Sequence, residues 1–165
     1  MIRYATLPSP LGPLRLTADD EALHAVEFID DVQQQTTPPQ GRLDSNAVLE
    51  RAAEQLGEYF DGRRRDFDLP LRPQGTPFQR RVWDALLGIP FGVTVSYGEI
   101  AARIGAPNAM RAVGAANGRN PIAVIIPCHR VIGSNGTLTG YGGGLPRKVK
   151  LLRLEGAWTQ ALPLG

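Results

Sequence analysis

A charged stretch with two prolines, residues 61–75, separates two parts of the chain that differ in their apolar patterns. Before it, short segments with partial alternation are typical of strands. After it, apolar residues recur at helical spacing behind helix-start signals. We therefore expect two units, an N-terminal α/β unit over residues 1–72 and a mostly helical C-terminal unit over residues 73–165. The predicted fold class is α/β in the broad sense (α+β).

Three short segments near the start are predicted to form a small antiparallel sheet. They span residues 2–7, 14–17 and 22–28, and turn-forming residues join the first two. A helix with a one-sided apolar stripe is predicted over residues 46–60. We expect this first unit to support the second and to carry no chemistry.

The two parts differ in charge. Residues 1–72 carry 8 Arg against 13 Asp and Glu, a net charge of −5. Residues 73–165 carry 10 Lys and Arg against only Asp84, Glu99 and Glu155, a net charge of +7. A basic unit indicates a polyanion partner, most commonly nucleic acid, although ordinary surface charge explains the count equally well.

Helix-start signals punctuate the basic unit. Thr76, followed three residues later by a glutamine, forms one capping box, and Ser96 begins the next helix in the same way. That helix ends at Gly105, and Asn108 is predicted to cap another over residues 109–117. Two short helices joined in this way have the spacing of a helix-turn-helix, a corner that also occurs in folds that do not bind DNA.

The single cysteine, Cys128, lies at the end of the apolar run 121–126, which has the composition of a buried strand or extended segment. It is followed by His129, which could accept the thiol proton directly or through a water, because the thiolate is the nucleophilic form. An inert buried thiol is the alternative. One cysteine and two histidines are too few for a four-ligand structural zinc site, so no metal is expected.

A carboxylate that orients His129 would complete such a site, and Glu155 is the candidate because Glu99 is assigned to capping. Glu155 lies at the C-terminal end of a helix that begins near Pro146. The helix dipole disfavours an acid at that end, so a role opposite His129 would explain its position. By that argument, neutralising Glu155 would stabilise the helix by roughly 0.3–1 kcal/mol. A solvated surface acid is the alternative.

Three glycines follow Tyr141 and permit close approach of the backbone to a flat ligand, with a flexible loop as the alternative. Taken together, four ordered motifs resemble those of the O6-alkylguanine-DNA alkyltransferases. The motifs are Ser96-Tyr97-Gly98-Glu99, Arg111-Ala112-Val113-Gly114, Pro127-Cys128-His129-Arg130-Val131-Ile132-Gly133 and Tyr141-Gly142-Gly143-Gly144. The resemblance is dense from about residue 75 to 156 and weaker before it.

The resemblance implies DNA repair by direct, irreversible transfer of an alkyl group, with no cofactor, from O6-alkylguanine and also O4-alkylthymine to the protein's own cysteine. Cys128 would be the acceptor, His129 its base through a bridging water, and Glu155 the orienting carboxylate. Asn120 would be a hydrogen-bonding support. Tyr97 would press on the target phosphate and protonate the departing guanine.

The resemblance also implies how DNA is held. Arg111 would fill the place that the flipped base leaves in the stack, with the helix-turn-helix in the minor groove. Small residues of the second helix would allow close approach: Ala109, Ala112 and Gly114. The base pocket would be lined by Asn117, Val131, Tyr141, Gly142, Gly143 and Lys148. Some relatives have a serine where this chain has Gly142, so a backbone group would replace that side-chain hydrogen bond.

The implied partner is double-stranded DNA that carries O6-alkylguanine, bound by a monomer, with clustering on DNA left open. We expect a cytoplasmic protein with no membrane contact, since neither a signal-peptide pattern nor an apolar stretch of membrane length is present. Two other functions stay open. A non-catalytic lesion-binding relative should lack the acceptor cysteine, and a Cys-His-Glu hydrolase would have no use for Arg111.

Overall fold

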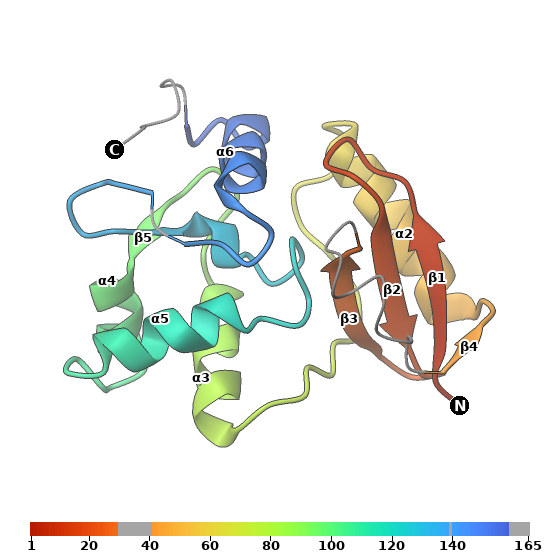
Figure 1. The fold of residues 1–165 in the computed structure, drawn as a ribbon, viewed down its shortest axis with the longest axis horizontal. Helices are drawn as coiled ribbons and strands as arrows, with labels where there is room; N and C mark the ends of the chain where they lie inside the picture. Colours follow the sequence, from red (N-terminus) through yellow and green to blue (C-terminus); the bar gives the residue numbers. More distant parts are fainter. Residues whose placement is uncertain (30–40, 139, 159–165) are drawn as a thin grey trace. The chain divides into compact units, whose positions relative to one another are not determined.

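The structure is a computed structural model that describes residues 1–29, 41–138 and 140–158 (Figure 1). The chain divides into two compact units, Met1–Gln74 and Gly75–Gly165. Among the described residues, the first contains a sheet and one helix, and the second is mostly helical. The predicted α/β (α+β) class is therefore confirmed. Within these described ranges, no helix is both long and apolar enough for a membrane crossing.

A four-stranded sheet forms the first unit, in the order β3-β2-β1-β4. The three predicted strands are present and pair antiparallel, as expected. They are β1 (Arg3–Leu7), β2 (Leu14–Ala18) and β3 (Leu23–Phe28). The fourth, β4 (Arg42–Leu43), pairs parallel to β1 and was not predicted, because two exposed residues give no alternation to recognise.

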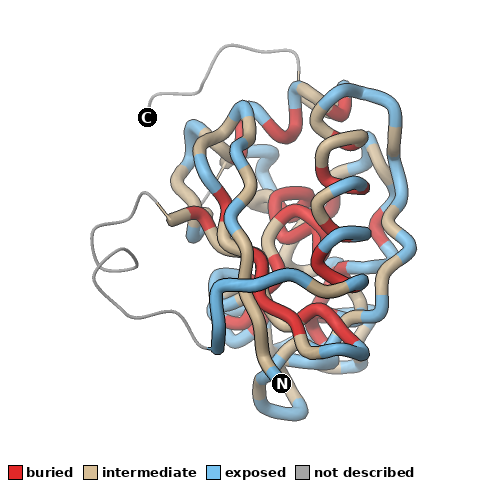
Figure 2. Tube along the Cα trace, turned by 90° about the vertical axis from the view of Figure 1, so that its right-hand side faces the viewer, coloured by how far each residue is buried: buried red, intermediate tan, exposed pale blue. Residues whose placement is uncertain are grey.

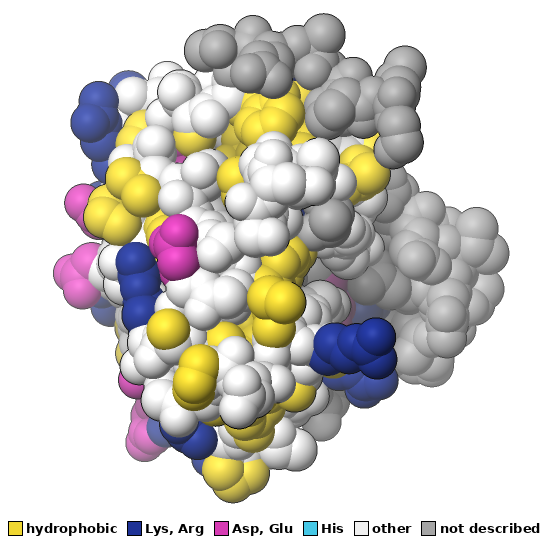
Figure 3. Space-filling view, turned by 90° about the vertical axis from the view of Figure 1, so that its left-hand side faces the viewer, with side chains coloured by type: hydrophobic (Ala, Val, Ile, Leu, Met, Phe, Trp, Pro, Cys, Tyr) yellow, Lys and Arg dark blue, Asp and Glu magenta, His cyan; other side chains and the backbone are white. Residues whose placement is uncertain are grey.

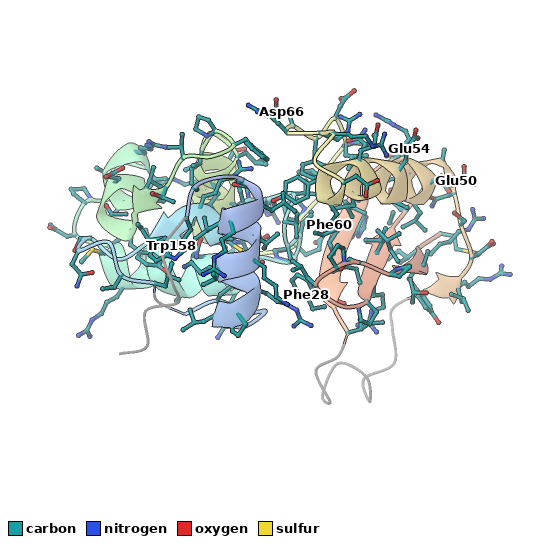
Figure 4. All side chains as sticks on the ribbon, turned by 90° about the horizontal axis from the view of Figure 1, so that it is seen from above. Phe28, Glu50, Glu54, Phe60, Asp66 and Trp158 are labelled. Carbon is teal, nitrogen blue, oxygen red and sulfur yellow. The ribbon has the colours of Figure 1, made fainter. Side chains whose placement is uncertain are left out.

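One helix, α2 (Ala47–Phe60), packs against this sheet (Figure 1). The side chain of Asn46 caps it, accepting a hydrogen bond from the backbone N–H of Leu49 at 2.9 Å. Glu50 and Glu54 project away from the sheet into solvent (Figure 4). The opposite stripe is buried and gives the unit its own core, made of Leu49, Ala52, Leu56 and Tyr59 with Leu14 and Leu16 of β2.

Among the residues that the structure describes, four helices form the frame of the second unit. Along the chain, buried segments alternate with intermediate and exposed ones, as Figure 2 shows from the side of the first unit. The four helices are α3 (Pro77–Leu86), α4 (Tyr97–Arg103), α5 (Met110–Gly118) and α6 (Leu145–Leu154). Between α5 and α6 lies a 3₁₀ turn, η1 (Cys128–Arg130). It leads into β6 (Val131–Ile132), which pairs parallel with β5 (Val95–Ser96).

The predicted helix-turn-helix is formed by α4 and α5, which pack on each other and on α3. The Ser96 hydroxyl accepts from Glu99 N at 3.1 Å, as an N-cap should. The indole N–H of Trp83 on α3 donates to the carbonyl of Ala116 at 2.8 Å in a buried position, which ties α5 to the frame.

The prediction that Asn108 caps α5 was wrong. The helix begins at Met110, its N-cap is Ala109, and no side chain caps it. Ala109 N donates instead to the carbonyl of Ala106 at 2.9 Å, so Asn108 lies inside the turn between the helices, one residue too early to cap.

The prediction of a strand or extended segment over residues 121–126 was also wrong, although most of the run is buried. The segment is a series of turns in which Val124 takes a φ of +71°. Asn120 closes these turns with its own amide: its Oδ1 accepts from Ile122 N at 2.9 Å, and its Nδ2 donates to Ile126 O at 2.8 Å. Apolar composition predicted burial correctly, but a side chain replaced the strand's hydrogen bonds.

Candidate active site

Cys128 begins η1 just after the turns of residues 121–126 that Asn120 closes, called the Asn120 turn below, and is buried, with 6% of its surface exposed. Its backbone N–H donates to Ile126 O at 2.8 Å, and its carbonyl accepts from the side-chain amide of Asn117 at 3.3 Å. The sulfur is therefore carried by a short backbone segment that is fixed from both sides, by the turn and by α5.

His129 and Glu155 form a buried pair. The Nε2 atom of His129 lies 2.8 Å from Glu155 Oε2. A carboxylate can only accept, so Nε2 carries the proton and the Nδ1 atom of a neutral ring keeps its lone pair. Nδ1 is buried and has no hydrogen-bond partner among the described residues. Burial lowers the pKa of His129 despite the nearby Glu155, so the ring is neutral and able to take a proton.

The thiol has its proton in the resting protein. Burial raises the pKa of Cys128, while the Asn120 amide and the Lys148 ammonium act in the opposite direction. Lys148 is itself fully buried, and its Nζ donates to Val131 O at 2.6 Å. Its burial lowers the pKa of Lys148 to about 8. A thiolate at this position therefore needs a proton acceptor, and the adjacent imidazole is chemically suited to that task.

Arg130 is the residue that sequence reasoning missed. It is buried, with 6% of its surface exposed, and its guanidinium grips Glu155 through Nε to Oε1 at 2.8 Å and Nη2 to Oε2 at 2.9 Å. One signal was available: Arg130 directly follows Cys128 and His129 in a motif at the end of an apolar run. An arginine in such a place needs a buried acceptor.

This contact also corrects the argument about Glu155. Glu155 is the C-cap of α6, as the sequence suggested, but it is a buried ion-pair partner and not a solvated acid. The dipole argument predicted that neutralising it would stabilise the protein. Removing its charge would instead leave Arg130 as an uncompensated buried cation, which is a far larger and opposite effect.

The structure brings together several of the residues expected to contact DNA. Tyr97 is the first residue of α4, and its ring lies against Gly114 of α5, where an added Cβ would be 3.9 Å from the ring. On the same helix Arg111 and Ala112 are exposed and Ala109 is half-buried at the N-cap. Figure 3 shows the side of this unit that carries α4 and α5, where uncharged and apolar side chains predominate and Lys and Arg stand singly.

The residues expected to line the base pocket form two groups, one bonded to the Cys128–Val131 segment and one in the glycine loop. Lys148 is bonded to Val131, and Asn117 is bonded to Cys128. The glycine loop passes the end of α5, since an added Cβ at Gly142 would lie 3.4 Å from Gly118 O. Within this loop, the backbone carbonyl of Tyr141 accepts a hydrogen bond from Gly144 N at 2.8 Å, and the backbone carbonyl of Gly143 accepts one from the Arg147 side chain at 3.1 Å. No cluster of three metal-ligating side chains occurs in the described part of the chain.

Two family models together cover most of the chain. Residues 2–73 match "6-O-methylguanine DNA methyltransferase, ribonuclease-like domain", and residues 77–157 match "6-O-methylguanine DNA methyltransferase, DNA binding domain". The chain belongs to the 6-O-methylguanine DNA methyltransferase family. The resemblance found in the four motifs is thereby confirmed.

Individual relatives of this methyltransferase agree. A methylated-DNA--protein-cysteine methyltransferase of Mycolicibacterium paratuberculosis is 54% identical over 157 residues, which cover 94% of this chain and 93% of that protein. The crystal structure of Mycobacterium tuberculosis O6-methylguanine methyltransferase matches with a TM-score of 0.85 at 50% identity, over 98% of this chain and 96% of that one. A structure of M. tuberculosis OGT in complex with DNA matches with a TM-score of 0.84 at 50% identity, over 93% and 92% of the two chains.

The activity follows from the family. The protein is a methylated-DNA--protein-cysteine methyltransferase, an enzyme of DNA repair that moves an alkyl group from DNA to a cysteine of its own chain. Its second unit is a DNA-binding domain, and DNA is its partner.

Proposed function

We propose that this methyltransferase removes the alkyl group of O6-alkylguanine in double-stranded DNA and keeps it on Cys128, with O4-alkylthymine as a further substrate. One observation carries the proposal. The single cysteine of the chain is buried beside a neutral imidazole whose free nitrogen can accept a proton and whose other nitrogen is held by a buried carboxylate. No cofactor is needed, because both the acceptor and the base are side chains.

In the proposed reaction, Nδ1 of His129 takes the thiol proton through a bridging water, and Glu155 stabilises the imidazolium that forms. The Cys128 sulfur attacks the alkyl carbon and forms a carbon–sulfur bond, while the bond from that carbon to O6 breaks. The electron pair stays on the guanine, which is neutralised by a proton from Tyr97. The product is a thioether, whose carbon–sulfur bond no group of the site can cleave to restore the thiol, so each molecule acts once.

The base must leave the duplex before a buried sulfur can reach it. In our proposal, α5 enters the minor groove, its small residues Ala109, Ala112 and Gly114 allow close approach, and Arg111 occupies the place of the flipped base. Tyr97 presses on the target phosphate. The exposure of Arg111 on α5 supports this assignment.

The flipped base would then lie among the residues around Cys128, with Asn120 supporting the acceptor turn. The pocket residues would be Asn117, Val131, Tyr141, Gly142, Gly143 and Lys148. Residues 73–165 would carry both DNA binding and alkyl transfer, and residues 1–72 would support them. We place a monomer in the cytoplasm, a reducing compartment that keeps the one thiol available.

Intact-mass spectrometry tests the proposal. Incubation with a duplex that contains one O6-methylguanine should add one methyl group per chain, and peptide mapping should find it on Cys128. Cys128→Ala should bind the duplex and gain no mass. More than one turnover per molecule, or a methyl group at another residue, would contradict the mechanism. Release of methanol without a mass gain would indicate a hydrolase.

A further inference from the structure

We infer that Arg130 is a positioning residue for the transfer reaction: its guanidinium fixes the Glu155 carboxylate that directs the lone pair of His129 toward Cys128. The inference rests on the proposed roles of Cys128, His129 and Glu155. It adds a fourth member, which touches neither the alkyl group nor the base and acts only through Glu155.

The first support is geometric. Arg130 holds both oxygens of Glu155 in a two-point contact, at 2.8 and 2.9 Å, and the same Oε2 atom lies 2.8 Å from His129 Nε2. A carboxylate held at both oxygens cannot rotate about its terminal bond without breaking a charge-assisted hydrogen bond. The acceptor for the His129 N–H is therefore fixed in direction, and with it the tautomer and the orientation of the ring.

The second support is the anchoring of Arg130 itself. Its Nη1 donates to the carbonyl of Ile89 at 2.6 Å, and its guanidinium carbon lies 5.9 Å from the ring centroid of Phe91. Gly92 belongs to the same loop, has a φ of +82°, and passes the Glu155 carbonyl so closely that an added Cβ would lie 3.2 Å from it. The loop after α3 is thus built around the Arg130–Glu155 pair, which joins α3, η1 and the end of α6.

The third support is charge. His129 is faced by the Glu155 carboxylate, which favours the imidazolium, and by the cations Arg130 and Lys148, which disfavour it; Cys128 is its neighbour along the chain. Burial is the largest cause that lowers the pKa of His129, the Glu155 carboxylate acts against it, and the two cations add to the lowering. Arg130 offsets the effect of Glu155 and keeps that carboxylate ionised. The ring then remains a neutral base in the resting protein.

Charge and geometry can be separated with two variants. Arg130→Gln removes the cation, so the pKa of His129 should rise and the acidic limb of single-turnover transfer should move up by about one pH unit. Arg130→Lys keeps the cation but loses the pair of hydrogen bonds that holds both oxygens of Glu155. Its acidic limb should stay near that of the wild type, while its maximal transfer rate should fall by about tenfold or more through loss of orientation.

A matched control comes from the other unit. Arg15 also contacts a carboxylate through two nitrogen atoms, with Nε and Nη2 at 3.1 and 2.8 Å from Glu27 Oε2. Arg15→Gln should therefore lose an arginine–carboxylate contact of the same kind and leave the pH profile of transfer unchanged.

The second measurement needs no DNA and is therefore independent of the proposed function. The chain has only two histidines, so ¹⁵N spectra of the rings are simple, and His24, bonded to Asp19 in the first unit, is an internal reference. Wild-type His129 should show a protonated Nε2 and an unprotonated Nδ1 at neutral pH. Arg130→Gln should shift His129 toward the imidazolium, and Arg130→Lys should show a mixture of tautomers, with His24 unchanged in both.

The outcomes are separable. Folded Arg130 variants with wild-type pH profiles, maximal rates and ring spectra would overturn the inference. An imidazolium, or a proton on Nδ1, in the wild-type spectrum at neutral pH would overturn it even if neither variant folds. A wild type that transfers no alkyl group to Cys128, yet shows the expected ring spectra, would contradict the proposed function and leave the positioning of His129 by Arg130 intact.

Discussion

The side-chain amide of Asn117 donates to the backbone carbonyl of Cys128 at 3.3 Å, and its other atom, Oδ1, is buried without a hydrogen-bond partner in the described part of the chain. The helix proposed to enter DNA is thus bonded directly to the backbone of the proposed alkyl acceptor. A displacement of α5 on DNA would be felt at the nucleophile through this contact.

Asn117→Leu removes this bond and the unpartnered oxygen together. The two effects on stability oppose each other, so the free energy of unfolding should change by no more than about 1 kcal/mol. Single-turnover transfer should slow, because α5 no longer holds the Cys128 backbone. Asn117→Asp is the informative companion: it places a carboxylate oxygen against the Cys128 carbonyl and should destabilise more than Leu does. Full transfer activity in a folded Asn117→Leu protein would rule out this link.

Arg111→Ala should affect extrusion of the base more than the chemical step. Unstacking a base costs a few kcal/mol, so loss of the residue that fills its place should slow repair of duplex DNA by about tenfold or more. Transfer from free O6-methylguanine base should change little. Arg119, exposed at the C-cap of the same helix, gives a charge-matched control. Equal losses on the duplex and on the free base would argue against extrusion.

Glu155→Gln should both weaken the fold and slow transfer. The buried Arg130 loses its counter-charge, for which we expect a loss on the order of 3 kcal/mol in the free energy of unfolding. The neutral amide also stabilises an imidazolium poorly, so His129 accepts the thiol proton less readily. Urea unfolding and single-turnover rates measure the two effects. A Glu155→Gln protein more stable than the wild type would restore the dipole argument.

Because of Lys148, the free energy of unfolding should depend on pH in the alkaline range. Its pKa is about 8 in the folded protein against 10.5 ordinarily, so the folded state gives up its proton first. The cost of the buried ammonium is present in full below pH 8 and is relieved as the pH rises toward 10.5. The free energy of unfolding of Lys148→Met should therefore exceed that of the wild type most near pH 7. The expected gain is on the order of 3 kcal/mol, reduced by the loss of the hydrogen bond to Val131.

Urea unfolding at pH 7 and pH 10 measures this difference, and the gap between variant and wild type should narrow at the higher pH. Lys150→Met, on the exposed side of the same helix, should give a gap that does not vary. Parallel behaviour of Lys148→Met and Lys150→Met would show that the buried ammonium carries no such cost.

Local signals predicted much of this fold. The capping box at Thr76 and Gln79 forms in both directions, with hydrogen bonds of 3.1 and 2.9 Å, because it depends only on two residues three positions apart. The three strands of the first unit were likewise readable from alternation. The turn over residues 121–126 was not, because an apolar run reports burial and says nothing of a hydrogen bond supplied by the neighbouring Asn120.

The site shows the same limit. Cys128 and His129 are adjacent in sequence and stood out by rarity of residue type. Glu155 could be proposed by elimination, since the second unit contains only three acids. Arg130 could not be assigned a partner, because its acceptors come from Ile89 and Glu155, 41 and 25 residues away, and only the tertiary fold brings them together.

The backbone turn that carries Cys128 and the base proposed to activate it depend on contacts of very different sequence separation. Both of the turn's hydrogen bonds join residues no more than six positions apart, whereas the base beside Cys128 depends on a carboxylate 26 residues farther along the chain. Contacts between near neighbours form early in folding, and distant ones form late. Until α6 docks, a partly folded chain therefore lacks the Glu155 carboxylate that orients His129, so the proposed base beside Cys128 is completed only by the last long-range contacts of the fold.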